Sequence, residues 1–225
     1  MIINLHMEIT DKHGMDLDYE FRNITDSSVV ATATNHFNDY FKLHYQNKIY
    51  EFRNYPKIVK RSMINFRFPF STKWKRTIGF GIHCQKKEIG VFYGDAMRCR
   101  EKGLKKNISV TVFQYESKAY LLCRVGFPKE KSHYYCLFDE NGNLISVIER
   151  HTYYDDDCKA TLYIEHEENM FITLLTCTEK IICVGNSGDS DSTIDPSAGP
   201  YVSVLKEEKE LFDENFIQRV KAAER

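Results

Sequence analysis

The sequence lacks the long apolar runs and the N-terminal signals that mark membrane and exported proteins. No apolar stretch reaches the length that a transmembrane helix needs. The first residues, Met1–Glu8, have too short an apolar run and no basic lead-in for a signal peptide. From these absences we expect a cytoplasmic protein with no transmembrane segment.

Catalytic and metal-binding motifs are also missing. There is no nucleophile elbow, phosphate loop, Gly-rich dinucleotide turn or His-Glu-x-x-His motif. The 7 cysteines include no Cys-x-x-Cys pair and no zinc-type spacing, so they are interpreted as reduced, buried side chains. The acidic runs Asp155–Asp157 and Asp189–Asp195 lack the full pattern of a calcium loop. We predict no cofactor, no metal and no enzymatic activity, but a Cys/His nucleophile assembled from distant residues stays open as an alternative.

Composition is that of an ordinary globular protein. The chain has 225 residues, of which 42% are hydrophobic and 28% are charged, with a formal net charge of −1. A chain of this length can bury a sizeable core without a disulfide or a metal. Because the net charge is close to zero, any attraction to a membrane or a nucleic acid has to come from a local excess of charge.

Short apolar runs joined by turn residues recur through the first two thirds of the chain. Residues Ser109–Phe113 alternate between polar and apolar, as a half-buried strand does, and Gln46-Asn47 and Glu116-Ser117 suit tight two-residue turns. The predicted hairpins pair Tyr19–Ile24 with Val29–Thr34, Tyr40–Tyr45 with Lys48–Phe52, Thr77–Cys84 with Glu88–Tyr93 across Gln85–Lys87, Ile108–Tyr115 with Lys118–Val125, and Tyr134–Phe138 with Leu144–Arg150. Further strands are expected over Ile2–Ile9, Arg67–Phe70 and Ala160–Ile164. A meander of this length favours a mainly β fold, an antiparallel β-barrel of about 12 hairpin-connected strands.

One predicted helix, over residues 169–184, is apolar on nearly every side. Such a helix has to be buried on every side, and this one is too short to cross a bilayer. We therefore expect a central hydrophobic helix inside the barrel, and packing across an open sheet face is the alternative. The barrel and this helix would make up one domain over residues 1–185.

The end of the chain is predicted to form a separate helix. Residues 186–200 are rich in Gly, Ser, Asp and Pro and indicate a flexible linker. In the segment 201–225, Leu205, Phe212, Phe216 and Val220 recur at helical spacing, which predicts an amphipathic C-terminal helix from about Lys206 to Ala223. Its apolar stripe would dock on the barrel or, alternatively, bind a protein partner.

The charge pattern suggests where a ligand could bind. No acidic residue lies between Glu51 and Glu88, and aromatic residues are interleaved with the basic ones. A basic, aromatic surface would suit an anionic membrane surface or a phosphoinositide, and it would also suit single-stranded nucleic acid or a protein partner. A solvated face with inward-pointing aromatics is the fourth alternative. The candidate ligand-binding residues are Arg53, Lys57, Lys60, Arg61, Arg67, Lys73, Trp74, Lys75 and Arg76.

The order of a hairpin, a strand and an apolar helix resembles the tubby C-terminal-like superfamily, which includes LURP-one-related proteins and phospholipid scramblases. The residues that carry the resemblance are Tyr135–Glu149, Ala160–Ile164 and Met170–Ile182. The resemblance implies a 12-stranded barrel threaded by a hydrophobic helix, and it implies a role at phosphoinositides or membranes. Together with the basic segment, it leads us to predict a non-enzymatic, cytoplasmic module that binds anionic phospholipid headgroups, peripheral at a membrane.

Overall fold

The described part of the chain is mainly β. The computed structural model describes residues 3–13, 16–36, 40–60, 76–98, 107–127, 132–150, 159–179 and 211–222. Twelve strands form one antiparallel sheet, accompanied by two α-helices and one short 3-10 helix. Their bounds are β1 Ile3–His13, β2 Asp16–Asn23, β3 Val29–His36, β4 Tyr40–Tyr45, β5 Lys48–Lys60, β6 Arg76–Cys84, β7 Lys87–Arg98, β8 Asn107–Tyr115, β9 Lys118–Phe127, β10 Ser132–Phe138, β11 Leu144–Arg150, β12 Ala160–Ile164, η2 Glu167–Asn169, α1 Met170–Cys177 and α4 Glu214–Ala222.

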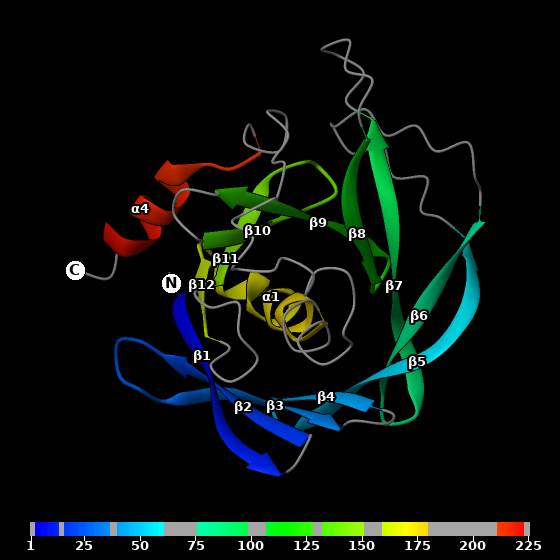
Figure 1. The fold of residues 1–225 in the computed structure, drawn as a ribbon, viewed down its shortest axis with the longest axis horizontal. Coiled ribbons are helices and arrows are strands. Elements are labelled where there is room, and N and C mark those ends of the chain that lie inside the picture. The colour runs from blue at the N-terminus through cyan, green and yellow to red at the C-terminus, as the bar shows by residue number, and fades with distance from the viewer. Residues whose placement is uncertain are drawn as a thin grey trace, which may run out of the picture.

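The strands pair in chain order, and the first strand also pairs with the last. β1 pairs with β2 along one side and with β12 along the other, where Ile3 lies opposite Ile164 and Met7 lies opposite Ala160. Each strand therefore has two neighbours, and the strand order closes into a ring (Figure 1). The prediction of about 12 antiparallel, hairpin-connected strands is confirmed.

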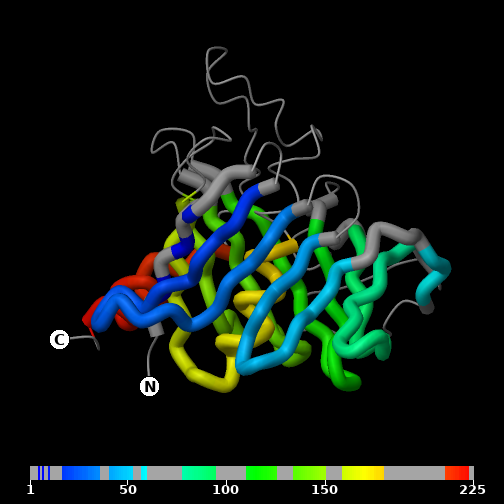
Figure 2. Tube along the Cα trace, turned by 90° about the horizontal axis from the view of Figure 1, so that it is seen from below, coloured from blue at the N-terminus to red at the C-terminus, as the bar shows by residue number. Residues whose placement is uncertain are grey.

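At one end of the ring, tight turns join β4 to β5, β6 to β7 and β8 to β9. Gln46 and Asn47 both have positive φ, and so do Glu116 and Ser117, as a two-residue turn matched to the twist of a hairpin requires. The turn between β6 and β7 is one residue shorter than predicted, because only residues 85 and 86 form it and β7 begins at Lys87. In Figure 2, the turns between β4 and β5 and between β8 and β9 lie at the lower end of the molecule.

The strands are longer than the hydrophobic pattern indicated, and β5 is the clearest case. It was expected to end at Phe52 but continues to Lys60. Its pairing with β6 shifts between Arg53 and Lys57, and this irregularity contains Pro56. A proline lacks the N–H that a regular ladder needs, so an irregularity is where a strand accommodates it. The predicted strand Arg67–Phe70 lies outside the described residues.

Helix α1 is buried as predicted. Seven of its eight residues are buried, and Leu174, Leu175 and Cys177 have no exposed surface. They share one hydrophobic cluster with interior side chains from many strands, including Leu5, Phe21, Leu43 and Leu162. In Figure 1, α1 lies in the middle of the view with strands on all sides. The α-helix covers Met170–Cys177 of the predicted 169–184: Asn169 belongs to η2, and Thr178 and Glu179 continue the helix with a wider, π-type turn. Residues 180–184 lie outside the described residues.

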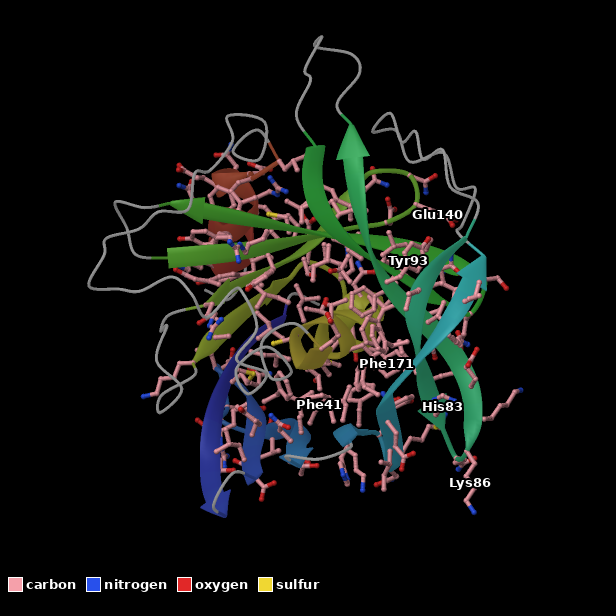
Figure 3. All side chains as sticks on the ribbon, turned by 45° about the vertical axis from the view of Figure 1, so that its right-hand side comes forward. Phe41, His83, Lys86, Tyr93, Glu140 and Phe171 are labelled. Carbon is pink, nitrogen blue, oxygen red and sulfur yellow. The ribbon has the colours of Figure 1, made fainter. Side chains whose placement is uncertain are left out.

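Phe171, the one α1 side chain that is only partly buried, connects the helix to three strands. Its ring centroid lies 4.5 Å from that of Tyr50, 5.1 Å from that of Tyr115 and 5.6 Å from that of Tyr45. Phe171 is labelled in Figure 3, where it lies beside α1. Such ring pairs contribute about 0.5–1.5 kcal/mol each beyond their buried area. The contacts fix the start of α1 against β4, β5 and β8.

A second hydrophobic cluster lies on the other face of β8 to β12. In β10, Tyr135 and Leu137 belong to the cluster around α1, whereas Tyr134, Cys136 and Phe138 belong to the second one. Helix α4 contributes Phe216 and Val220 to this second cluster, and neither has any exposed surface. The prediction that the C-terminal helix docks its apolar stripe on the sheet is confirmed, although the observed helix is shorter than Lys206–Ala223. The segments 186–200 and 201–210 lie outside the described residues.

Candidate functional site

The structure places four of the nine predicted ligand-binding residues, all on two neighbouring strands. Arg53, Lys57 and Lys60 belong to β5, and Arg76 is the first residue of β6. The strand register sets Lys60 opposite Arg76, while Lys57 lies opposite Gly79. The other five, Arg61, Arg67, Lys73, Trp74 and Lys75, lie outside the described residues.

Residues 57–60 of β5 and 76–79 of β6 form what we call the β5–β6 ribbon. The described pairing of β4 with β5 ends at Arg53, and that of β6 with β7 begins at Phe80. Among the described residues, the eight ribbon residues therefore have ladder partners only in one another. The ribbon lies at the right-hand edge of Figure 1, at the far end of β5.

One face of the ribbon packs on the body of the protein. The Val59 side chain is buried in the second hydrophobic cluster together with Tyr93 of β7. A Cβ atom added at Gly79 would lie 2.9 Å from the Phe92 carbonyl oxygen and 2.8 Å from Val59 Cγ2. These distances are shorter than an ordinary contact, so the absence of a side chain at position 79 lets the ribbon approach β7.

The opposite face of the ribbon is exposed to solvent and apolar. Ile58 and Ile78 lie directly opposite each other, with 73% and 64% of their surface exposed. They are the two most exposed large hydrophobic side chains among the described residues. Alternate residues of a strand share a face, so the backbone positions of Lys60 and Arg76 belong to the same face as this isoleucine pair.

Lys57 differs from the other basic residues because it has an acidic partner. Its Nζ atom forms an ion pair with a carboxylate oxygen of Glu88, the residue that ends the acid-free stretch. The same oxygen lies 3.9 Å from His83 Nε2. Both side chains of the Lys57–Glu88 pair are more than a third exposed, so the pair contributes about 0.2–1 kcal/mol to stability. Because Glu88 partly compensates the positive charge of Lys57, this lysine is a weaker candidate for an anion contact than the sequence alone suggested.

A cavity of about 380 Å³ with an acidic lining lies at the tight-turn end of the ring. Four carboxylates line it, those of Asp139, Glu140, Glu165 and Glu168. Burial raises the pKa of the Tyr120 hydroxyl, and three of these carboxylates and that of Glu116 raise it further. The sequence did not predict this cavity, because its lining comes from segments that are far apart in the chain.

The acidic cavity and the two basic positions of the ribbon lie at opposite ends of the ring. In an antiparallel meander, successive connections alternate between the ends. The turn at residues 139–143 lies at the same end as the turns at 46–47 and 116–117, whereas Lys60 and Arg76 stand where β5 leaves, and β6 enters, the opposite end.

The described cysteines give little support to a nucleophile. Cys123, Cys136 and Cys177 are fully buried, and only Cys84 is partly exposed. Cys84 follows His83 in β6, and consecutive strand residues point to opposite faces of a sheet. Within the described ranges, no group of three or more His, Cys, Asp or Glu side chains could hold a metal ion. None of the described helices is long and apolar enough to span a membrane.

Comparison with known proteins assigns no family to the chain. No protein-family model matches the sequence, and neither the curated proteins nor the solved structures give a match. The resemblance to the tubby C-terminal-like superfamily therefore stays a hypothesis that depends on residue pattern.

Proposed function

We propose that this protein is a non-enzymatic binding module for anionic phospholipid headgroups, and that the exposed face of the β5–β6 ribbon is its contact surface. The observation that carries the proposal is the register of the ribbon. It pairs two highly exposed isoleucines, Ile58 and Ile78, and next to them it pairs two basic positions, Lys60 and Arg76.

This combination of residue types suits the boundary between a bilayer and water. A basic residue near an anionic membrane surface contributes about 1 kcal/mol to binding, and apolar side chains gain by leaving water for the acyl boundary. A soluble anion could use the two basic positions but would have no use for two exposed isoleucines beside them. The membrane surface is thus the ligand that accounts for both halves of the ribbon face.

We infer further that the ring of strands is a barrel closed around α1, as in the tubby-like fold, and that the protein is cytoplasmic and peripheral at its membrane. The closed strand order and the burial of α1 support the barrel. In this arrangement the ribbon extends from the end of the barrel opposite the acidic cavity. An anionic surface would then attract the ribbon and repel the acidic cavity, which favours binding with the ribbon toward the membrane.

Co-sedimentation with lipid vesicles tests the proposal. We expect the protein to bind phosphatidylcholine vesicles containing a phosphoinositide or phosphatidylserine, and to stay in solution with phosphatidylcholine alone. The double variant Lys60→Glu/Arg76→Glu removes two favourable contacts, so its affinity should fall by roughly 30-fold or more. The matched control is Lys48→Glu/Lys118→Glu at the tight-turn end, which should bind as the unaltered protein does. Absence of vesicle binding at low salt would refute the proposal.

The aliphatic pair has its own variant. Ile58→Ser/Ile78→Ser should keep binding at low salt but lose binding at physiological salt, because the contribution that salt does not screen is removed. The control is Ile24→Ser/Ile49→Ser, at two isoleucines that are 47% and 44% exposed, one in the turn after β2 and one near the start of β5. Equal loss of binding in both double variants would mean that the ribbon is not the contact surface.

The packing of α4 disfavours the alternative of a protein-interaction scaffold that uses the C-terminal helix. The apolar side chains of α4 that would have met a partner, Phe216 and Val220, are already fully buried against the sheet. Single-stranded nucleic acid is the remaining alternative. It would bind the basic positions without depending on the isoleucines, so the same variants distinguish it from a membrane.

A further inference from the structure

Two cysteines far from the ribbon face each other on adjacent strands. The register of β9 and β10 places Cys123 directly opposite Cys136, and neither cysteine forms a disulfide bond. Directly opposed residues of an antiparallel pair have Cα atoms about 4.5 or 5.5 Å apart, depending on the type of pair. Disulfides span Cα separations of about 4.4–6.8 Å. The strand pairing therefore already holds this cysteine pair at a separation that a disulfide bond can bridge.

Both thiols lie on the face of the sheet on which α4 docks, and the helix itself contacts β1 and β12. Cys123 and Cys136 have no exposed surface and belong to the second hydrophobic cluster, together with Phe216 and Val220 of α4. The turn that leads into the helix lies close by, because the negative charge of Asp213 acts on the Cys136 thiol. Phe212, one residue earlier, has its ring centroid 4.4 Å from that of Tyr134, which neighbours Cys136 on the same face of β10.

While they are buried, the two thiols react slowly with oxidants. Burial raises the pKa of Cys136 far above the ordinary range of a thiol, and the charge of Asp213 adds to this effect. Oxidation proceeds through the thiolate, so the cysteine pair is protected from oxidation while α4 is docked on the sheet. Reactivity at Cys136 then depends on how often α4 and the turn before it lift from the sheet.

Helix α4 is held by a small set of contacts. It has nine residues, of which only Phe216 and Val220 are buried. Around these, Arg219 Nε lies 3.4 Å from a Glu165 oxygen, and Lys221 Nζ lies 5.2 Å from the Tyr163 ring centroid. A short terminal element with few buried contacts opens more readily than the rest of a fold. Lifting α4 would expose the face of β10 that carries Cys136 without breaking any strand pairing.

We propose that Cys123 and Cys136 form an oxidation site, at which a hydroperoxide converts the two thiols into an intramolecular cross-strand disulfide when α4 lifts from the sheet. One thiolate attacks the peroxide oxygen, breaks the O–O bond and becomes a sulfenic acid, while the leaving oxygen takes a proton to give an alcohol or water. The second thiol then attacks the sulfenic sulfur and releases water. Overall, two thiols are oxidised, one hydroperoxide is reduced, and the strand pairing on either side is unchanged.

Peptide mapping of the full-length protein after treatment with hydrogen peroxide tests this site. Trypsin separates Cys123, on the peptide 119–124, from Cys136, on the peptide 132–150. We expect a linked pair of these peptides, two hydrogens lighter than their sum, that disappears on reduction and is absent from Cys123→Ser and from Cys136→Ser. The matched control is Cys177→Ser, since Cys177 is equally buried but lies on α1 with its Sγ atom 3.7 Å from Met7 Sδ. This variant should form the linked peptides normally.

The part played by α4 has a separate readout. Phe216→Ala weakens the docking of the helix and should increase the rate of disulfide formation by roughly tenfold or more, with strand content unchanged by circular dichroism. Val220→Ala provides a milder version should the first variant fold poorly. If both thiols become open to alkylation in these variants but no linked peptides form, the proposal is wrong. If linked peptides form at the same rate in all variants, the pair is accessible without any movement of α4, and that part of the proposal fails.

Discussion

Replacing Leu174 by aspartate tests the burial of α1 most directly. Leu174 has no exposed surface, and it lies in the middle of the helix within the cluster that joins α1 to the strands. Truncating such a leucine to alanine costs about 2–5 kcal/mol through lost burial and the cavity that is left. A carboxylate at the same place adds several kcal/mol, because no partner there would compensate for the loss of water. The total approaches the whole free energy of unfolding of a typical domain, about 5–15 kcal/mol.

We therefore expect Leu174→Asp to be unfolded or aggregated at neutral pH, and Leu175→Asp to behave in the same way. Leu174→Ala should stay folded with a Tm lower by about 5–15 °C, measured by circular dichroism on heating. The control is Ile49→Asp, at a position with 44% exposure, where a charge remains in water and the Tm should change little. A soluble Leu174→Asp protein that melts at the same temperature as the unaltered protein would refute the burial of α1.

Two further predictions concern other parts of the fold. Gly79→Val should loosen the β5–β6 ribbon, because the added Cβ would meet the Phe92 carbonyl oxygen at 2.9 Å. We expect faster amide hydrogen exchange at residues 57–60 and unchanged exchange in β10. Equal exchange at residues 57–60 in the variant and the unaltered protein would contradict the packing. The second prediction is an effect of alkaline pH. Burial raises the pKa of Tyr163, and its 2.8 Å hydrogen bond to Glu149 raises it further, so the stability that this tyrosine contributes is fully present below pH 10 or so and is lost as the pH rises above that value. Tyr163→Phe should therefore be less stable than the unaltered protein at pH 8, as measured by urea unfolding. Between pH 9 and 11 the variant should lose less stability than the unaltered protein, by up to about 1.4 kcal/mol per pH unit. If the unfolding free energy depends on pH in the same way in both proteins, the Tyr163 proton is not coupled to folding.

The sequence predicts best where local chemistry and tertiary packing agree. Strand β12 has the predicted bounds, Ala160–Ile164, because it is a short apolar run with every residue buried. The turn at Gln46-Asn47 was also correct, since a two-residue link between two alternating strands leaves little choice of turn type. Strand β5 was underestimated, because the irregularity that accommodates Pro56 interrupts the alternation on which the prediction relied.

The polar residues of α1 show why a buried helix can still contain threonine. Thr176 donates a hydrogen bond to the Thr173 carbonyl oxygen at 3.0 Å, and Thr178 donates one to the Leu174 carbonyl oxygen at 2.8 Å. The hydroxyl oxygens of Thr173 and Ser146 lie 2.8 Å apart. Threonines that bond back to their own helix bring no unpaired hydroxyl into the core. Polarity alone was thus a poor guide to whether this helix fits a hydrophobic interior.

The candidate site could be predicted only in part. The absence of acidic residues between Glu51 and Glu88 indicated a basic segment, and that feature is visible in any reading of the sequence. It could not indicate that Ile58 and Ile78 would be opposed and exposed, because this depends on the register of two strands separated by residues 61–75. The acidic cavity was missed for the same reason, since its lining comes from two hairpins and the start of η2.

The two proposed sites depend on different strands of the ring and can therefore be tested independently. Membrane binding relies on the exposed face of β5 and β6, whereas the cysteine pair relies on β9, β10 and the docking of α4. Variants at Lys60 and Arg76 should leave disulfide formation unchanged, and variants at Cys123 should leave vesicle binding unchanged. If membrane binding instead shifted the thiol–disulfide equilibrium of the cysteine pair toward the disulfide, the two sites would be coupled through the second hydrophobic cluster, because that cluster contains both Val59 of the ribbon and Phe216 of α4. A coupling of this kind has to be reciprocal, so the oxidised protein would then bind vesicles more tightly than the reduced protein.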